Sequence, residues 1–287
     1  MRFFKYLVFV SVLVAMGLSY SAAQRRPAYI TPHRFELGEE LHFEAEFSRA
    51  LLRNIDVADL KFHATRTSLD GASQPYALTF KADVSSKGFF ARLFNLKFRE
   101  RVESTVEPLT FTIQKTTILD EQGKRVRTTE TTFDASKGRM IWTSRDPNNP
   151  AAEPRHAITE FSGQLQDVLS AIYFIRTQPL EVGKTFEVYI GDGGKVYTIP
   201  VKVVEKKRMK TILGRVNVLK VNPELFGPDR LIDKENGEFT IWITDDARHI
   251  PVASRVKTDY GTFDIKLKRI VNPDQGLPQK VTKTQIE

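Results

Sequence analysis

The sequence contains no cysteine among its 287 residues. No disulfide can hold the fold together, so its stability must come from a hydrophobic core. The length suffices for this, because a domain of about 300 residues buries roughly three quarters of its unfolded surface. The absence also excludes a lipid anchor of the lipoprotein type, which needs a cysteine after the signal segment. We therefore expect a soluble protein that is not a lipoprotein.

The sequence also lacks the run of about 20 apolar residues that a membrane span needs. Its longest apolar stretch is short and interrupted, from Leu7 to Met16, with Arg2 and Lys5 before it and small residues up to Ala23 after it. This order is typical of a secretory signal peptide. We predict that residues 1–23 are a signal peptide cleaved near Ala23. The mature protein should then be periplasmic or otherwise exported, with no membrane span.

Patterns for metal or catalytic chemistry are missing as well. The histidines show no paired spacing, so we expect no metal and no cofactor. The glycines of 191–194 connect two predicted strands and open no helix, which excludes a phosphate loop. Asp245 and Asp246 are adjacent on a strand and should diverge, whereas acid–base catalysis needs two converging carboxyls about 5–10 Å apart. We predict that the protein has no catalytic residues and is not an enzyme.

A formal net charge of +8 could indicate a nucleic-acid partner. The basic residues are scattered among acids, however. Their densest cluster, 206–210, falls where we expect a hairpin turn that is exposed to solvent. Export from the cytoplasm argues in the same direction. We predict no nucleic-acid partner.

The sequence is rich in strict alternation of apolar and polar residues. The stretch from Leu41 to Phe47 alternates in this way, and 76–84 and 109–113 repeat the pattern. Such alternation indicates strands with one buried face, which antiparallel sheets allow. Glycine-containing turns, as at 191–194, separate the strands at hairpin spacing. We predict a mainly β fold, an antiparallel meander that forms a curved sheet or an open β-barrel.

Two segments break the strand pattern. Residues 167–177 place apolar side chains on one face of an amphipathic helix, with Asp167 positioned as its N-cap. Residues 87–95 are rich in phenylalanine and predict a second short helix. The domain organisation that we expect is a signal peptide at 1–23, a mobile leader at 24–34, a single β-rich domain at 35–271 and a disordered tail at 272–287.

Several motifs occur in order along the chain: Gly38-Glu39-x-Leu41, Arg99-x-Arg101-x-x-Ser104, Phe133-Asp134, the ten residues from Asp167 to Arg176, Pro179-Leu180-x-x-Gly183, Trp242-Ile243-Thr244-Asp245-Asp246 and Ile250-Pro251-Val252. By these motifs the chain resembles, from Gly38 to Leu267, the bacterial envelope family known as domain of unknown function 3108. The resemblance implies an exported, mostly antiparallel β domain, similar in outline to curved-sheet carriers of lipids and lipoproteins. It implies no catalytic residues.

The phenylalanine segment is the candidate for ligand binding. Phe89, Phe90 and Phe94 would share a helical face with basic residues such as Lys87 and Arg92 around it. The helix would either plug one end of the sheet, or form a hydrophobic lid over a cavity or a surface that enters lipid. The basic residues would suit anionic lipid headgroups.

The leading hypothesis is a non-enzymatic periplasmic protein that binds an apolar or amphiphilic, lipid-like ligand in the concavity of the sheet. Phe89, Phe90, Phe94 and Tyr173 are the predicted ligand-binding residues. The alternative is an interaction module that docks on another envelope protein or on cell-wall glycan, through exposed aromatics such as Trp142. An open apolar cavity would favour the first hypothesis, and a filled core with an exposed aromatic patch would favour the second.

Overall fold

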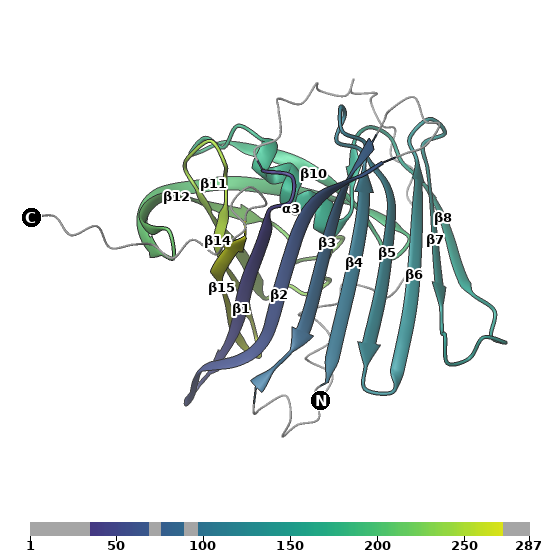
Figure 1. Ribbon diagram of the computed structural model, residues 1–287, viewed down its shortest axis with the longest axis horizontal. Helices are drawn as coiled ribbons and strands as arrows, with labels where there is room; N and C mark the ends of the chain where they lie inside the picture. The colour runs from purple at the N-terminus through teal and green to yellow at the C-terminus, as the bar shows by residue number, and fades with distance from the viewer. Residues whose placement is uncertain (1–34, 69–75, 89–96, 272–287) are drawn as a thin grey trace, which may run out of the picture.

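The computed structural model describes residues 35–68, 76–88 and 97–271. These residues form one sheet of fifteen strands and one α-helix (Figure 1). The elements are β1 (Glu40–Arg49), β2 (Leu52–Ser68), β3 (Tyr76–Ser86), β4 (Phe98–Val106), β5 (Ile113–Gln122), β6 (Arg125–Asp134), β7 (Arg139–Arg145), β8 (Arg155–Glu160), β9 (Leu165–Gln166), α3 (Val168–Thr177), β10 (Thr185–Asp192), β11 (Lys195–Thr211), β12 (Gly214–Pro223), β13 (Gly237–Thr244), β14 (Pro251–Thr258) and β15 (Gly261–Val271).

The first and last strands of the chain, β1 and β15, pair with each other in the middle of the sheet. Two arms extend from them: the first arm runs from β2 to β8, and the second arm runs from β14 down to β9. The strands pair antiparallel with their chain neighbours, except for a short parallel pair of β9 and β10. The ends of the sheet, β8 and β9, do not pair with each other. The predicted meander and open curved sheet are therefore confirmed.

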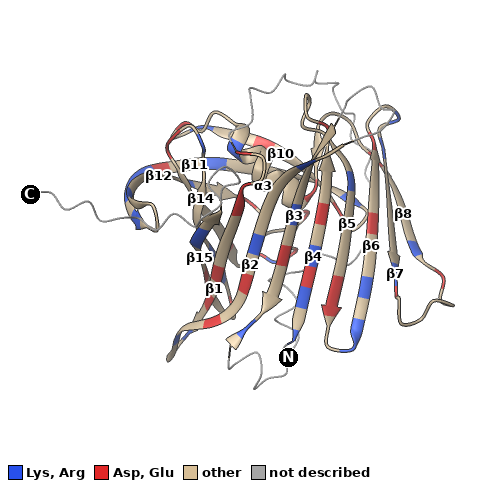
Figure 2. Cartoon of the chain, in the orientation of Figure 1, with Lys and Arg blue, Asp and Glu red and all other residues tan. Residues whose placement is uncertain are grey.

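The alternation in the sequence is the reason why the sheet has one buried face and one exposed face. On β1 the side chains of Leu41, Phe43 and Ala45 are buried on the inner face. Acidic and basic residues are spread along β1 to β6, as Figure 2 shows. Exposed pairs such as Lys266 with Glu46, at 2.7 Å between Nζ and Oε2, belong to the outer face. Such surface pairs contribute about 0–1 kcal/mol each, so the inner face determines stability.

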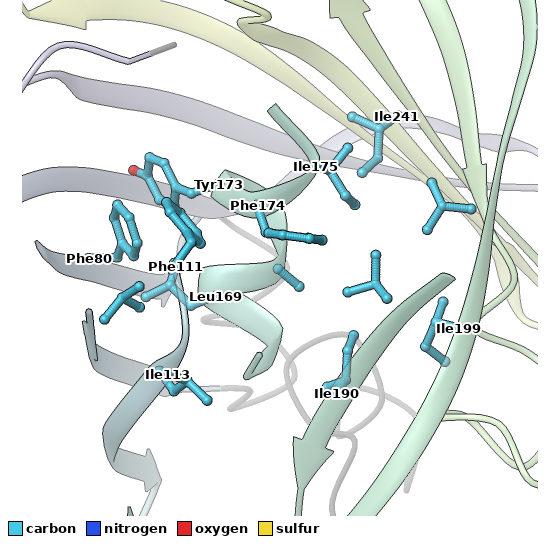
Figure 3. Packing of buried hydrophobic residues seen from close by; sticks show 14 of the residues in the cluster. Phe80, Phe111, Ile113, Leu169, Tyr173, Phe174, Ile175, Ile190, Ile199 and Ile241 are labelled. Atoms are coloured by element: carbon cyan, nitrogen blue, oxygen red, sulfur yellow. The ribbon is translucent and has the colours of Figure 1, made fainter. Parts of the chain in front are cut away.

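Helix α3 lies between the two arms on the inner face and confirms the helix predicted at 167–177. Figure 3 shows Phe80 and Phe111 beside Tyr173 on one side of the helix. The ring of Tyr173 stacks on Phe80 with a centroid distance of 4.0 Å. Side chains of the second arm, such as Ile199, lie on the other side of the helix. The helix thus joins the two arms into one core.

Two local predictions were wrong. Residues 109–113 do not form a continuous strand, because the Glu107 carboxylate accepts hydrogen bonds from the backbone nitrogens of Leu109 and Thr110 and closes a turn there. Leu109 is exposed, and β5 begins only at Ile113. The basic cluster at 206–210 lies on β11 and not in a hairpin turn, since that strand continues to Thr211.

Several predictions lie outside the described residues. These are the signal peptide, the leader at 24–34, the tail at 272–287 and most of the second helix at 87–95. Among the described residues, no helix is both long enough and apolar enough to cross a membrane.

Candidate ligand cavity

A buried ion pair fixes the C-terminal end of α3. Arg176 donates from Nη1 and Nη2 to the two carboxylate oxygens of Glu39, at 2.6 and 3.1 Å. Arg176 is fully buried, and Nη2 also donates to the carbonyl oxygen of Arg248 at 3.2 Å. His249 Nδ1 donates back to the carbonyl oxygen of Arg176 at 2.9 Å. The helix is therefore held both to the start of β1 and to the loop between β13 and β14.

Asp167 fixes the N-terminal end of α3 and is its N-cap, as predicted. Its Oδ1 accepts from the backbone nitrogen of Ser170 at 2.6 Å, which satisfies a free helix amide. Its Oδ2 accepts from the hydroxyls of Ser104 on β4 and Thr116 on β5, the latter at 2.6 Å. One carboxylate thus caps the helix and ties it to the first arm. Glu39, Ser104, Asp167 and Arg176 all belong to the sequence motifs quoted above, so these motif residues share the task of positioning α3.

An apolar cavity of about 320 Å³ lies between α3 and the inner face of both arms. This is within the range of about 300–1,000 Å³ for small-molecule sites. The apolar wall comes from α3 (Val168, Leu169, Ile172, Tyr173), from β1 and the first arm (Leu41, Phe43, Leu60, Phe62, Ala82, Val84, Val102, Ile118, Trp142), and from β15 and the second arm with its loops (Ile265; Leu225, Phe226, Leu231, Ile232, Phe239, Ile241, Pro251, Ala253, Val256).

One face of α3 is left uncovered where it meets the cavity. Val168 is 44% exposed although it lies on the cavity wall, and Ile172 is only partly buried. Other side chains of the helix, such as Ala171 and Phe174, are buried in the core and do not line the cavity. An amphipathic helix normally buries its apolar face. Here part of that face borders a space that an apolar ligand could fill.

Besides Asp167, two further carboxyl groups interrupt the apolar wall. Glu100 on β4 is 9% exposed, and its Oε2 atom is buried and finds no hydrogen-bond partner. Burial, and then the charges of Asp120 and Asp192, raise the pKa of Glu100 to about 9. Asp192, at the end of β10, has a buried and unpartnered Oδ2 atom. Burial and then the charge of Asp167 raise its pKa to about 7. The wall therefore holds carboxyl oxygens that are ready to bond a guest molecule.

The predicted binding residues are only partly described. Tyr173 lies on the cavity wall and is 1% exposed, and its hydroxyl has no hydrogen-bond partner. Phe89, Phe90 and Phe94 lie outside the described residues. A role for these four side chains in ligand binding stays a prediction.

Two residues differ from their expected surroundings. Trp142 is not an exposed aromatic, because it shares the inner face of the sheet with its cross-strand neighbour Thr131 and lines the cavity. Lys87 is not free for an anionic headgroup, since its Nζ pairs with Glu44 at 2.9 Å and Asp59 at 2.7 Å. Both side chains are occupied by contacts within the chain.

The acidic wall residues were missed by the sequence interpretation, although a signal was present for one of them. Val102, Ser104 and Val106 alternate on the inner face of β4, and counting back by two places Glu100 on that same face. For Asp192 no such signal existed, because its surroundings in 191–194 predict only a turn. Its position depends on where the β10–β11 hairpin meets the first arm.

The acidic and histidine side chains of the described residues do not gather into a metal site. Among the described residues, no group of three or more His, Cys, Asp or Glu side chains could hold a metal ion. Asp245 and Asp246 lie in the loop after β13 and not on a strand, contrary to the prediction. Their partners differ: Asp245 pairs with Lys206, and Asp246 accepts hydrogen bonds from the backbone nitrogens of Arg248 and His249. What the geometry offers is an apolar space with hydrogen-bonding groups on one wall.

Three solved structures with which the chain aligns come from bacteria. A β-barrel-like protein of the family DUF1849 from Brucella abortus aligns with a TM-score of 0.45 and 9% identity, over 82% of this chain and 98% of that chain. A protein provisionally described as a lipoprotein, from Parabacteroides distasonis, aligns with a TM-score of 0.32 and 8% identity, over 84% and 99%. A protein provisionally described as exported, from Bacteroides fragilis, aligns with a TM-score of 0.30 and 10% identity, over 85% and 100%.

At the level of sequence, no curated protein matches the chain. The family described as protein of unknown function, DUF3108, matches residues 43–268. This range runs from β1 to β15 and includes α3 and both arms around the cavity. The chain therefore belongs to the DUF3108 family.

Proposed function

We propose that this protein is a non-enzymatic periplasmic protein that holds an apolar or amphiphilic ligand between α3 and the curved sheet. The observation that carries this proposal is the apolar cavity of about 320 Å³ at the uncovered face of α3. A filled core would have closed over Val168 and Ile172. An apolar guest of suitable length would remove this surface from water, which contributes about 25 cal/mol per Å².

The way in which α3 is held also supports a binding role. The ion pair of Arg176 with Glu39 and the bonds of Asp167 to β4 and β5 fix both ends of the helix. A wall that is already ordered loses little conformational entropy when a ligand enters. The interior is therefore preorganised for a guest and does not need to fold around it.

The alternative, a docking module for an envelope protein or glycan, finds less support. It would need an exposed aromatic patch, whereas Trp142 faces the cavity. Apart from Val168 at the cavity, the most exposed large hydrophobic side chains among the described residues are aliphatic: Leu51, Leu52, Leu109, Ile158 and Val182. Scattered single side chains of this kind are normal on a protein surface.

Mass spectrometry of solvent extracts from the protein purified out of its native envelope tests the proposal. We expect an amphiphile to co-purify in a fixed ratio to the protein. Binding of an apolar naphthylamine dye, followed by its fluorescence, gives a second measurement. We expect the double variant Val168→Gln/Ile172→Gln to weaken dye binding about tenfold, since about 1–2 kcal/mol of apolar contact is lost.

The matched control is Val182→Gln, which changes an equally exposed valine that is not on the cavity wall. Glutamine is a good helix former, so both Val168 and Ile172 can be replaced without loss of the helix. The control should bind the dye as the wild type does. Equal dye binding by all three proteins, together with no co-purifying amphiphile, would contradict the proposal.

A further inference from the structure

The polar wall of the cavity has a chemistry of its own. Glu100 is more than nine-tenths buried, and its Oε2 finds no hydrogen-bond partner. A buried polar atom without a partner costs about 1–3 kcal/mol, so its presence needs an explanation. Asp192 repeats the feature on the opposite arm, with a buried Oδ2 that is also unpartnered. Two unsatisfied carboxyl oxygens from different arms therefore border the same space.

The charges along this wall are unbalanced. Glu100, Asp167 and Asp192 line the cavity, and Arg176 is the basic residue on the described part of the wall. The guanidinium of Arg176 is already bonded to both oxygens of Glu39. The carboxylate of Asp167 is likewise satisfied, by Ser104, Thr116 and Ser170. The side chains of the wall that remain without a partner for their charge are acidic, because neither Glu100 nor Asp192 has a cationic partner on this wall.

We propose that the cavity takes an amphiphile with a protonated amine headgroup, which donates hydrogen bonds to Glu100 and Asp192 while its chain lies along the apolar face of α3. This inference rests on the proposed function and adds the headgroup to it. An ammonium group has three donors and can bond both unpartnered carboxyl oxygens at once, whereas a hydroxyl has only one donor. A buried ion pair of this kind also supplies the countercharge that the wall lacks.

The shifted pKa values of the two acids agree with this choice of headgroup. Asp192 raises the pKa of Glu100, and Asp167 raises the pKa of Asp192, so the acids repel each other's charges. A positive headgroup would relieve this repulsion. An anionic headgroup would add to it, and a fatty acid should therefore be the poorest guest. The apolar remainder of the wall makes no such distinction among headgroups.

Calorimetric titration of the purified protein with three ligands of equal chain length tests the inference: dodecylamine, dodecanol and dodecanoate, with the ionic ligands kept below their micelle concentrations and dodecanol below its solubility limit. We expect dodecylamine to bind at least tenfold more tightly than dodecanol, and dodecanoate to bind most weakly. Charge-assisted hydrogen bonds to a buried group justify a difference of this size. The variants Glu100→Gln and Asp192→Asn should each weaken amine binding about tenfold and leave dodecanol binding within twofold.

Glu103→Gln is the matched control, since Glu103 lies on the outer face of the same strand and pairs there with Lys81. It should leave all three affinities unchanged.

Equal binding of the three ligands, or preference for dodecanoate, would overturn the headgroup inference and leave the proposed function standing. Binding of none of them would overturn both. Thermal melting of each variant verifies that a lost affinity is not a lost fold, and two independent carboxyl variants keep the test decisive if one of them unfolds.

Discussion

At the scale of single residues, Glu100 is the most unusual group in the molecule. Its cross-strand neighbours are Val84 on β3 and Asp120 on β5. Asp192 on β10 adds its charge on the cavity side. Arg125 pairs with Asp120 at 3.7 Å between Nη1 and Oδ2, but among the described residues no cation pairs with Glu100 itself, so Glu100 holds a proton. The site is therefore less stable in its ionised form than in its protonated form.

This predicts how the free energy of unfolding changes with pH. Folded Glu100 keeps its proton up to a pKa of about 9, whereas an unfolded glutamate loses it near 4.5. Between these values the folded state binds more protons than the unfolded state, so stability falls as the pH rises. Glu100→Gln removes this loss, and at pH 8 the variant should be more stable than the wild type by at least about 1 kcal/mol.

Denaturant unfolding of both proteins between pH 4 and pH 9 measures the effect. The two stabilities should be similar at pH 4 and diverge as the pH rises. The outer-face variant Glu103→Gln should follow the wild type throughout. Parallel curves for wild type and Glu100→Gln would show that Glu100 is ionised in the folded protein.

At the scale of elements, α3 depends on a buried ion pair that joins it to β1. Removing Arg176 alone leaves the charge of Glu39 buried without a partner, which costs about 3–5 kcal/mol. We therefore expect Arg176→Met to lower the free energy of unfolding by that amount. The double variant Glu39→Gln/Arg176→Met should recover a large part of the loss, since no uncompensated charge remains. Urea denaturation of the four proteins of this double-mutant cycle measures the coupling, and strictly additive losses would contradict it.

How far these elements were predictable depends on whether their signals are local. The helix at 167–177 could be predicted, because its periodicity and its cap at Asp167 are both encoded within eleven residues. The start of β5 could not, since the turn before it forms through the carboxylate of Glu107. The strand at 206–210 could not be predicted. Its side chains are mostly basic and exposed, so apolar and polar residues do not alternate there. The acidic residues of the cavity wall come from β4 and β10. No local signal in either strand indicates that the two strands border the same cavity.

At the scale of the whole molecule, the two arms meet without pairing. The hairpin between β10 and β11 reaches the edge strand β8, where Thr159 Oγ1 donates to the carbonyl oxygen of Gly194 at 2.5 Å. Gly191, on β10, also approaches the first arm closely, because a Cβ there would lie 2.7 Å from Met140 Sδ. These contacts bring Asp192 to the cavity wall. The shape of the cavity is therefore a property of how the arms close and not of either arm alone.

Gly194 tests this closure. Its φ is +80°, and a Cβ there would lie 2.6 Å from the Cβ of Ala157 on β8, so Gly194→Ala combines backbone strain with a clash between the arms. We expect a loss of about 2–4 kcal/mol in the free energy of unfolding. Gly214→Ala is the matched control, since its φ is +87° and nothing lies within 4 Å of its Cβ, so only the strain of about 1 kcal/mol remains.

Adding Ala157→Gly to Gly194→Ala should return the loss to the level of the Gly214 control, because the clash disappears while the strain stays. Thermal and urea unfolding measure the four proteins. If the arms meet as described, Gly194→Ala should also weaken binding of the naphthylamine dye, and the added Ala157→Gly should restore it. A Gly194→Ala protein no less stable than the Gly214 control would mean that the arms do not touch at this point, and the cavity would then lack its fixed outer wall.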